Sequence, residues 1–154
     1  MGPPKVRTCL YFERGGYAAA SFYVSLLPGS QIETVQGLGN AADPTVVEFT
    51  LAAAPMMILT DGPMFRLTPS VSISGLTKGQ AETDRLWAAL TPDGGAGSMC
   101  GWRTDRFGVS WQITPGPLMQ MNTSPDLAAA GRARAGMMSM RKIEIAALEA
   151  VFAG

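Results

Sequence analysis

Apolar residues occupy every second position over most of residues 45–52. One side of this segment is apolar, at Val47, Phe49 and Leu51, whereas Glu48 lies on the other side. A period of two predicts a strand with one buried and one open face. Strands are also predicted over residues 6–12, which are rich in β-branched and aromatic residues, and over residues 31–36 and 56–60.

A helical period follows the first predicted strand. Residues 17–27 have the helical spacing of apolar positions, and Pro28 ends this segment. The second half of the chain repeats the order of strand, helix and further strands. Its predicted elements are a strand around residues 71–74, a helix over 78–90, and a hairpin of 100–104 with 109–114.

The two halves also keep a common spacing. Thr8 corresponds to Ser72 and Phe22 to Leu86, both 64 residues further along. In the later strands Ile58 superposes best on Gln112, at an offset of 54. Such self-similarity predicts a duplicated β-α-β-β-β module in an α+β fold. The expected organisation is a single domain, 1–154, with modules at about 5–62 and 68–116 and a C-terminal helical extension at about 124–153.

The C-terminal extension has its own pattern. Ser124 followed by Pro125 predicts the N-cap and first turn of a helix that continues to about residue 140, and a last amphipathic helix is predicted over 143–152. Apolar residues of this extension need cover from the domain or from a second subunit, and they are Met137, Met138, Met140, Leu148, Val151 and Phe152. We therefore expect a homodimer with these helices at or near the contact.

The composition of the chain limits the classes of partner that we expect it to bind. The 154 residues contain 12 Lys+Arg and 12 Asp+Glu, which is not the charge balance of a nucleic-acid-binding protein. The chain has no long uncharged apolar run, and residues 1–14 lack the apolar core of a signal peptide, so we expect no membrane association and a cytoplasmic location. Cys9 and Cys100 are too far apart to indicate a disulfide framework or zinc site and are expected to be reduced.

The absence of histidine excludes several kinds of catalytic site. Ser-His-Asp triads, Cys-His pairs and HExxH zinc sites all need an imidazole, and the chain has none. Carboxylate, thiol, lysine or hydroxyl chemistry remains, as does simple binding.

Several stretches resemble a known family. They are residues 8–12 (TCLYF), 21–28 (SFYVSLLP), 100–102 (CGW), 107–113 (FGVSWQI) and 142–150 (KIEIAALEA). They are similar to the PhnB-like branch of the vicinal oxygen chelate superfamily, which includes glyoxalase I, extradiol dioxygenases and the fosfomycin and bleomycin resistance proteins. The resemblance implies that the two modules form a cupped mixed sheet. This branch often bears the domain name 3-demethylubiquinone-9 3-methyltransferase, but Gly15-Gly16 opens a helix here and does not predict a nucleotide-binding loop.

The resemblance also implies positions for metal ligands. Metal-dependent members of the superfamily take ligands from the first and last strand of each module, which correspond here to Thr8, Ile58, Ser72 and Gln112. Only Gln112 is a usual ligand of such a site. We therefore expect neither a bound metal nor another cofactor.

Alternation assigns side chains to the two sides of the strands. Residues expected under the helices are Val47, Phe49, Val71, Ile73, Trp111 and Ile113. The candidate ligand-binding residues on the concave side are Thr8, Glu48, Ser72, Ser110 and Gln112, with Cys100 and Trp102 at the last hairpin.

Each of the more reactive candidates has two interpretations. Glu48 is either a general base or a carboxylate hydrogen-bonded to neighbouring hydroxyls. Cys100 is either a nucleophile or a small buried residue. Trp102 could stack on a flat ligand or belong to a core or dimer contact, whereas the amide of Gln112 could orient a carbonyl or amide group.

Three functions follow from these interpretations. The first is a metal-independent PhnB-like protein that binds a small organic ligand. The second is an enzyme of the same superfamily, of the lyase, isomerase or dioxygenase type, or one that uses Glu48 as its catalytic carboxylate. The third is a dimeric interaction protein without an open pocket.

Overall fold

The computed structural model describes the chain except for residues 1, 3, 38–42 and 92–95. The chain divides into two compact units, Met1–Leu67 and Thr68–Gly154. Each unit contains one of the two modules. The α+β class and the duplicated element order are confirmed, whereas a single domain spanning the whole chain stays a prediction.

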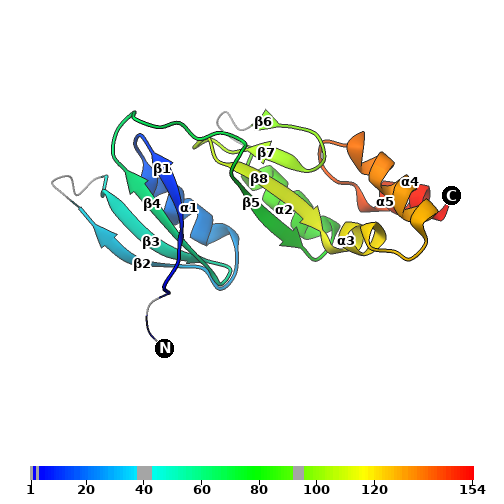
Figure 1. The fold of residues 1–154 in the computed structure, drawn as a ribbon, viewed down its shortest axis with the longest axis horizontal. Coiled ribbons are helices and arrows are strands. Elements are labelled where there is room, and N and C mark those ends of the chain that lie inside the picture. Colours follow the sequence, from blue (N-terminus) through cyan, green and yellow to red (C-terminus); the bar gives the residue numbers. More distant parts are fainter. Residues whose placement is uncertain (1, 3, 38–42, 92–95) are drawn as a thin grey trace. The chain divides into compact units, whose positions relative to one another are not determined.

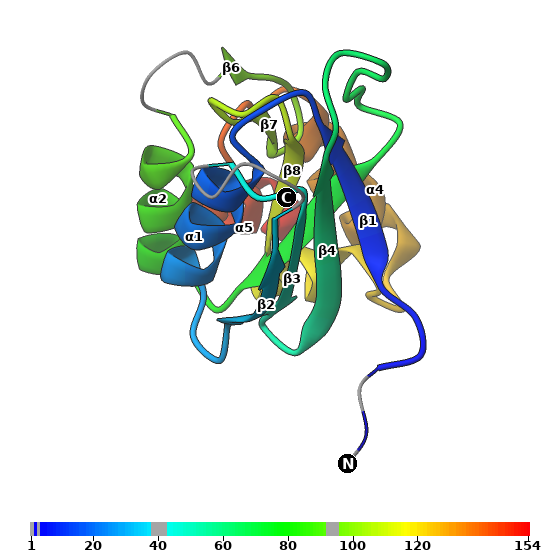
Figure 2. The same ribbon diagram turned by 90° about the vertical axis from the view of Figure 1, so that its left-hand side faces the viewer.

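The first unit is a four-stranded sheet with one helix on one of its faces (Figure 1). Its elements are β1 (Thr8–Phe12), α1 (Gly16–Leu26), β2 (Gln31–Gln36), β3 (Val46–Leu51) and β4 (Ala54–Thr60). The strand order is β1-β4-β3-β2, with β1 parallel to β4 and the other neighbours antiparallel. Turned by 90°, Figure 2 shows α1 alongside this sheet.

The buried face of the first sheet follows the alternation in β3. Val47, Phe49 and Leu51 are buried, as predicted, and α1 packs against this face. The approach is close at Gly16, where a Cβ would lie 2.5 Å from Ile58 Cγ2 and 2.2 Å from Thr60 Oγ1. Only glycine allows the helix to begin so near β4.

The second unit repeats the plan. Its sheet has the order β5-β8-β7-β6 and carries α2 on one face. The elements are β5 (Ser72–Thr77), α2 (Gln80–Ala89), β6 (Ala96–Gly97), β7 (Trp102–Thr104) and β8 (Ser110–Pro115). Trp111 and Ile113 are buried as predicted. The prediction was wrong for Val71, which precedes β5 and is 51% exposed, because the strand begins one residue too late to place it under α2.

Helices α3 (Gly116–Asn122), α4 (Leu127–Met138) and α5 (Ile145–Ala153) lie together beyond one end of the second sheet (Figure 1). Helix α3 was not predicted from the sequence, although the proline in its first turn is a helix-start signal. The N-cap of α4 lies two residues after the predicted Ser124. Asp126 is the N-cap, and its side chain accepts a hydrogen bond from Ala129 N at 2.9 Å.

The C-terminal helices cover most of their own apolar surface. Leu148 and Ile143 are buried with Leu118 and Met121 in one cluster. Met137, Met140 and Phe152 pack against this cluster, which leaves Met138 59% and Val151 39% exposed. Helices of the same chain therefore supply most of the cover, whereas the homodimer stays a prediction. Among the described residues, no helix has the length and apolar character needed to cross a bilayer.

Candidate functional site

The open face of the second sheet gathers polar side chains from three strands. Ser72 on β5 pairs in register with Ser110 on β8, and Trp102 on β7 pairs with Gln112 on β8. The alternate residues Trp111 and Ile113 are buried on the other face, against α2. Strand pairing therefore places four of the predicted ligand-binding residues on one sheet face.

Within this group, Gln112 Nε2 donates a hydrogen bond to Ser72 Oγ at 2.7 Å. An amide nitrogen has two hydrogens, so this bond leaves a second N–H and the carbonyl oxygen of Gln112 for a ligand. The Ser72 hydroxyl accepts from Gln112 and keeps its own proton for donation. The pair thus offers neighbouring donor and acceptor groups, and neither group is charged.

Cys100 occupies a different place. It lies in the turn before β7, with a positive φ of 59°, and its N–H donates to Met140 O at 2.7 Å. Its Sγ is 3.4 Å from Met138 Sδ. Cys100 therefore contacts the C-terminal helices instead of being one of the strand residues on the open sheet face.

Glu48 projects from β3 in the first unit on the side opposite Val47 and Phe49, as alternation predicts. Its Oε1 lies 3.3 Å from Arg7 Nε, and its Oε2 accepts a hydrogen bond from the Thr34 hydroxyl. Arg7 also donates to the backbone oxygens of Phe49 and Met56, at 3.4 and 3.3 Å. Both carboxylate oxygens of Glu48 thus have partners, as in its structural interpretation.

A β-bulge in β2 places a second carboxylate next to Arg7. The register of β2 against β3 shifts between Ile32 and Thr34, so Glu33 is the extra residue. Glu33 pairs with Arg7 and accepts a hydrogen bond from the Thr50 hydroxyl. The Thr50 and Arg7 hydrogen bonds hold the pKa of Glu33 below its ordinary value. Arg7 was not among the predicted site residues, because it precedes β1 and carries no periodic signal.

Thr8 is the one candidate that the structure moves to the other side of its sheet. It pairs in register with Met56, which is buried on the α1 side together with Phe49. The open-face positions of β1 are Cys9 and Tyr11 instead. The prediction was wrong because the parallel register of β1 on β4, which decides the face, cannot be read from β1 alone.

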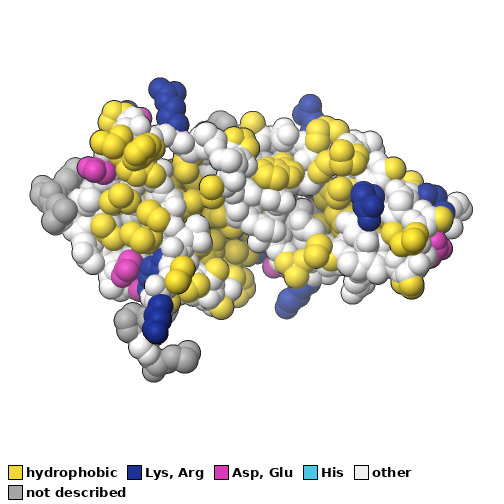
Figure 3. Space-filling view, viewed as in Figure 1, with side chains coloured by type: hydrophobic (Ala, Val, Ile, Leu, Met, Phe, Trp, Pro, Cys, Tyr) yellow, Lys and Arg dark blue, Asp and Glu magenta, His cyan; other side chains and the backbone are white. Residues whose placement is uncertain are grey.

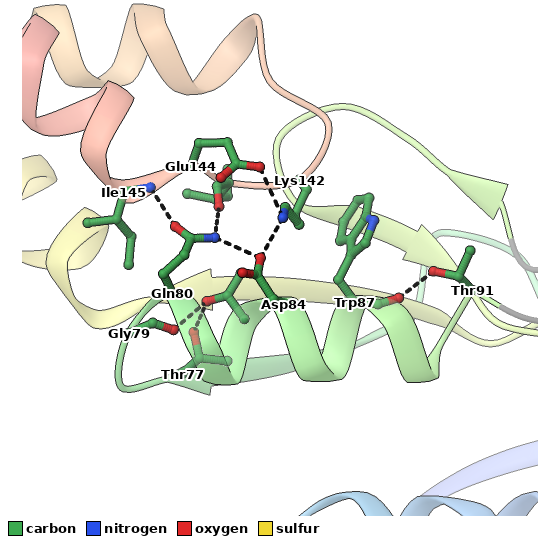
Figure 4. A network of polar contacts seen from close by, with 11 residues as sticks. Thr77, Gly79, Gln80, Asp84, Trp87, Thr91, Lys142, Glu144 and Ile145 are labelled. Atoms are coloured by element: carbon green, nitrogen blue, oxygen red, sulfur yellow. Dashed lines mark hydrogen bonds and ion pairs between the residues drawn. The ribbon is translucent and has the colours of Figure 1, made fainter.

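A network of polar contacts joins α2 to the segment before α5 (Figure 4). Gln80 Nε2 donates to Ile143 O at 3.1 Å and to Asp84 Oδ1 at 2.9 Å, and Gln80 Oε1 accepts from Ile145 N at 2.8 Å. Lys142 bridges Asp84 and Glu144. Hydrogen bonds from Lys142 and Gln80 lower the pKa of Asp84, and those to Asp84 and Glu144 raise the pKa of Lys142.

An open hollow at the beginning of α2 does not involve the predicted residues. It is lined by Lys78, Gly79, Gln80, Ala81, Glu82 and Arg85. Glu82 already accepts a hydrogen bond from Lys78 N at 2.8 Å, as a residue that satisfies a helix start does. We assign this hollow to the helix end and not to the binding site.

Comparison with known proteins decides the family. The family model described as 3-demethylubiquinone-9 3-methyltransferase matches residues 4–114. A PhnB protein from Bacillus cereus, whose name carries the same methyltransferase designation, is 28% identical, with a TM-score of 0.66 over 73% of this chain and 100% of that one. The chain belongs to the family that this model describes and is PhnB-like.

Other solved structures share the fold of this PhnB-like chain. A Pseudomonas aeruginosa protein is 24% identical, with a TM-score of 0.61 over 73% of this chain and 98% of its own. The fosfomycin resistance protein FosX from Listeria monocytogenes, solved with Mn(II), is 12% identical, with a TM-score of 0.51 over 78% of this chain and 98% of its own. The comparison with curated proteins gives no match.

The metal positions implied by the superfamily do not fit a transition-metal ion in this PhnB-like chain. Ile58 is fully buried on the α1 side of its sheet, and Thr8 lies on that same side. Ser72 and Gln112 are neutral and hydrogen-bonded to each other. Within the described part of the chain, no three His, Cys, Asp or Glu side chains come together as metal ligands would. The donors present lack the imidazole and carboxylate groups that hold such ions.

A methyltransferase, as the family is described, would need a glycine-rich nucleotide-binding loop, and Gly15-Gly16 does not form one. Gly15 has a φ of 76° and caps the start of α1, where its N–H donates to Asp43 Oδ2 at 2.9 Å. Gly16 lets α1 approach β4. Both glycines of this PhnB-like chain therefore have structural roles.

Proposed function

We propose that this PhnB-like protein binds a small organic molecule without a metal ion. The open face of the second sheet, with Ser72, Trp102 and Gln112, is the proposed binding surface, and Ser110 lies on the same side but is buried. The observation that carries the proposal is the hydrogen bond between Gln112 Nε2 and Ser72 Oγ, which orients both groups on a face that also holds an aromatic ring.

The chemistry of this face favours an uncharged polar ligand. Ser72 and Gln112 supply donors and an acceptor, and Trp102 supplies a flat apolar surface on the neighbouring strand. Glu48 is less suited to act as a general base, since Arg7 and Thr34 already engage both of its oxygens. Binding therefore accounts for these residues better than carboxylate catalysis does.

Native mass spectrometry of the full chain tests the proposal. Small molecules that co-purify with the wild-type protein should be lost from Gln112→Ala and from Ser72→Ala. Gln120→Ala is the matched control, because Gln120 is exposed on α3. The proposal would be contradicted if Gln112→Ala and Ser72→Ala retained the small molecule as well as the wild type does. It would also be contradicted if elemental analysis found close to one divalent metal ion per chain.

We also propose that the protein is a cytoplasmic homodimer. The edge strands β2 and β5 carry exposed apolar side chains, with Val35 46% and Leu76 66% exposed, and such edges favour pairing with a second copy. Free thiols at Cys9 and Cys100 suit a reducing compartment. Sedimentation of the full chain as a monomer at micromolar concentration would refute the dimer.

We expect neither nucleic acid nor a membrane as a partner. The formal net charge is zero, and on the face drawn in Figure 3 the Lys and Arg side chains of each unit do not gather into a broad patch. Nucleic-acid binding depends on such a concentration of positive charge.

A further inference from the structure

Arg103 is a buried cation on β7. It is only 3% exposed and pairs in register with Trp111 on the side of the sheet that faces α2. The guanidinium carbon lies 4.6 Å from the centre of the Trp87 ring. Trp87 projects from α2 on the same side as Gln80 and Asp84, as Figure 4 shows.

The Nε–H of this guanidinium lacks the hydrogen-bond acceptor that a buried arginine normally has. This Nε is buried, and within the described residues no carboxylate forms an ion pair with Arg103. Asp105, two residues along, already accepts from Phe107 N at 2.8 Å, Val109 N at 3.0 Å and Trp111 Nε1 at 2.9 Å. A guanidinium has five N–H donors, and the Trp87 ring satisfies none of them as an acceptor oxygen would.

Burial of an uncompensated charge is costly, because water no longer solvates it. Desolvation accordingly lowers the pKa of Arg103. A buried polar group without a partner calls for an explanation, and a bound ion or ligand is one of the usual ones.

The surroundings of Arg103 limit the size of such a ligand. A Cβ on Gly97 of β6 would lie 3.1 Å from Trp87 Cζ2 and 3.3 Å from Arg103 Nη1. The backbone of β6 therefore passes close over both groups, and it can do so because residue 97 has no side chain. This close packing excludes a large ligand from that side of the guanidinium.

We propose that Arg103 binds a small oxyanion, as a carboxylate or a phosphate group, where β6, β7 and α2 meet. A planar guanidinium matches both groups through paired hydrogen bonds. This site is separate from the proposed ligand-binding surface, because Arg103 and Gln112 project from opposite faces of the second sheet. Either proposal can fail without the other.

Thermal unfolding of the full chain tests the site, with inorganic phosphate in one series and acetate in another. Sodium chloride keeps the ionic strength constant, so that general screening does not change. At an anion concentration ten times its Kd, the wild-type midpoint should rise by roughly 3–6 °C. The anion with the lower Kd identifies which group the site prefers.

Arg103→Met should abolish this rise, since Met fills similar space without a charge. Arg106→Met is the matched control, because Arg106 belongs to the same hairpin and lies 4.9 Å from the Phe107 ring but is exposed. The control should respond like the wild type. An equal response of Arg103→Met and wild type, or no wild-type response to either anion, would overturn the proposal.

Nuclear magnetic resonance of the wild-type protein provides a test that does not depend on a variant folding. Phosphate or acetate should shift the Arg103 Nε–H and Trp87 indole N–H signals together, with one saturation curve. If both signals remain in place while signals of exposed arginines move, anions bind only to the surface and the proposal is wrong.

Discussion

Arg7 Nε lies 3.3 Å from Glu48 Oε1, so the strand carboxylate that the sequence offers as a general base is the ion-pair partner of an arginine. The Arg7 side chain is 8% exposed and also pairs with Glu33. It links the residue before β1 to β2 and β3, and we expect its main role to be structural.

Arg7→Met should lower the free energy of unfolding by about 1–3 kcal/mol, because two partly buried carboxylates lose their shared cation. Urea denaturation measures this change. Arg66→Met is the control, since Arg66 is exposed. If Arg7→Met lowers the free energy of unfolding no more than Arg66→Met does, the ion pairs contribute little to stability.

Asp105→Ala should be more damaging than removal of an ordinary helix cap. Asp105 is buried and accepts two backbone N–H bonds and one from the Trp111 indole, so its loss should cost about 3 kcal/mol or more. Asp126→Ala, which removes the N-cap of α4, should cost about 1 kcal/mol. Comparable losses in the two variants, by the same denaturation assay, would contradict this ranking.

The pKa of Asp84 predicts an acid-dependent contribution to stability. Because the folded pKa lies below the ordinary value, the contribution is fully present above the ordinary pKa of about 4 and is lost as pH falls through the folded pKa. The melting temperature of Asp84→Asn should therefore be lower than that of the wild type at about pH 7, and this difference in melting temperature should shrink toward about pH 2. Asp61→Asn, an exposed control, should show no such convergence.

Docking of the C-terminal helices should be essential to the second unit. Truncation after Gln120 removes α4 and α5 together with buried Ile143 and Leu148, which uncovers Leu118. We expect insoluble protein or loss of cooperative unfolding, measured by sedimentation and circular dichroism. A soluble truncated chain that unfolds as cooperatively as the full chain would contradict this expectation.

Single substitutions test the same docking more gently. Ile143→Ala should cost about 2–4 kcal/mol, because Ile143 is 1% exposed within the cluster. Val151→Ala, at a position 39% exposed, should cost less than about 1.5 kcal/mol. Equal costs would mean that Ile143 does not anchor the extension.

Local periodicity was sufficient for most elements and for several faces of the strands. Val47 and Phe49 are buried where alternation puts them, and so are Trp111 and Ile113, because side-chain direction within a strand is a property of that strand alone. The spacing between Thr8 and Ser72 likewise predicted the repeated module. It could not show which face of β1 carries Thr8.

Only the tertiary structure decided the partners of the polar side chains. Arg7 meets Glu48, and Gln112 meets Ser72, across 41 and 40 residues of sequence. Thr8 lies on the helix side because of its register against Met56 on another strand, and Arg103 is buried because α2 and β6 pack over it. These outcomes depend on which segments pair and at what register, and neither quantity is contained in the periodicity of a single segment.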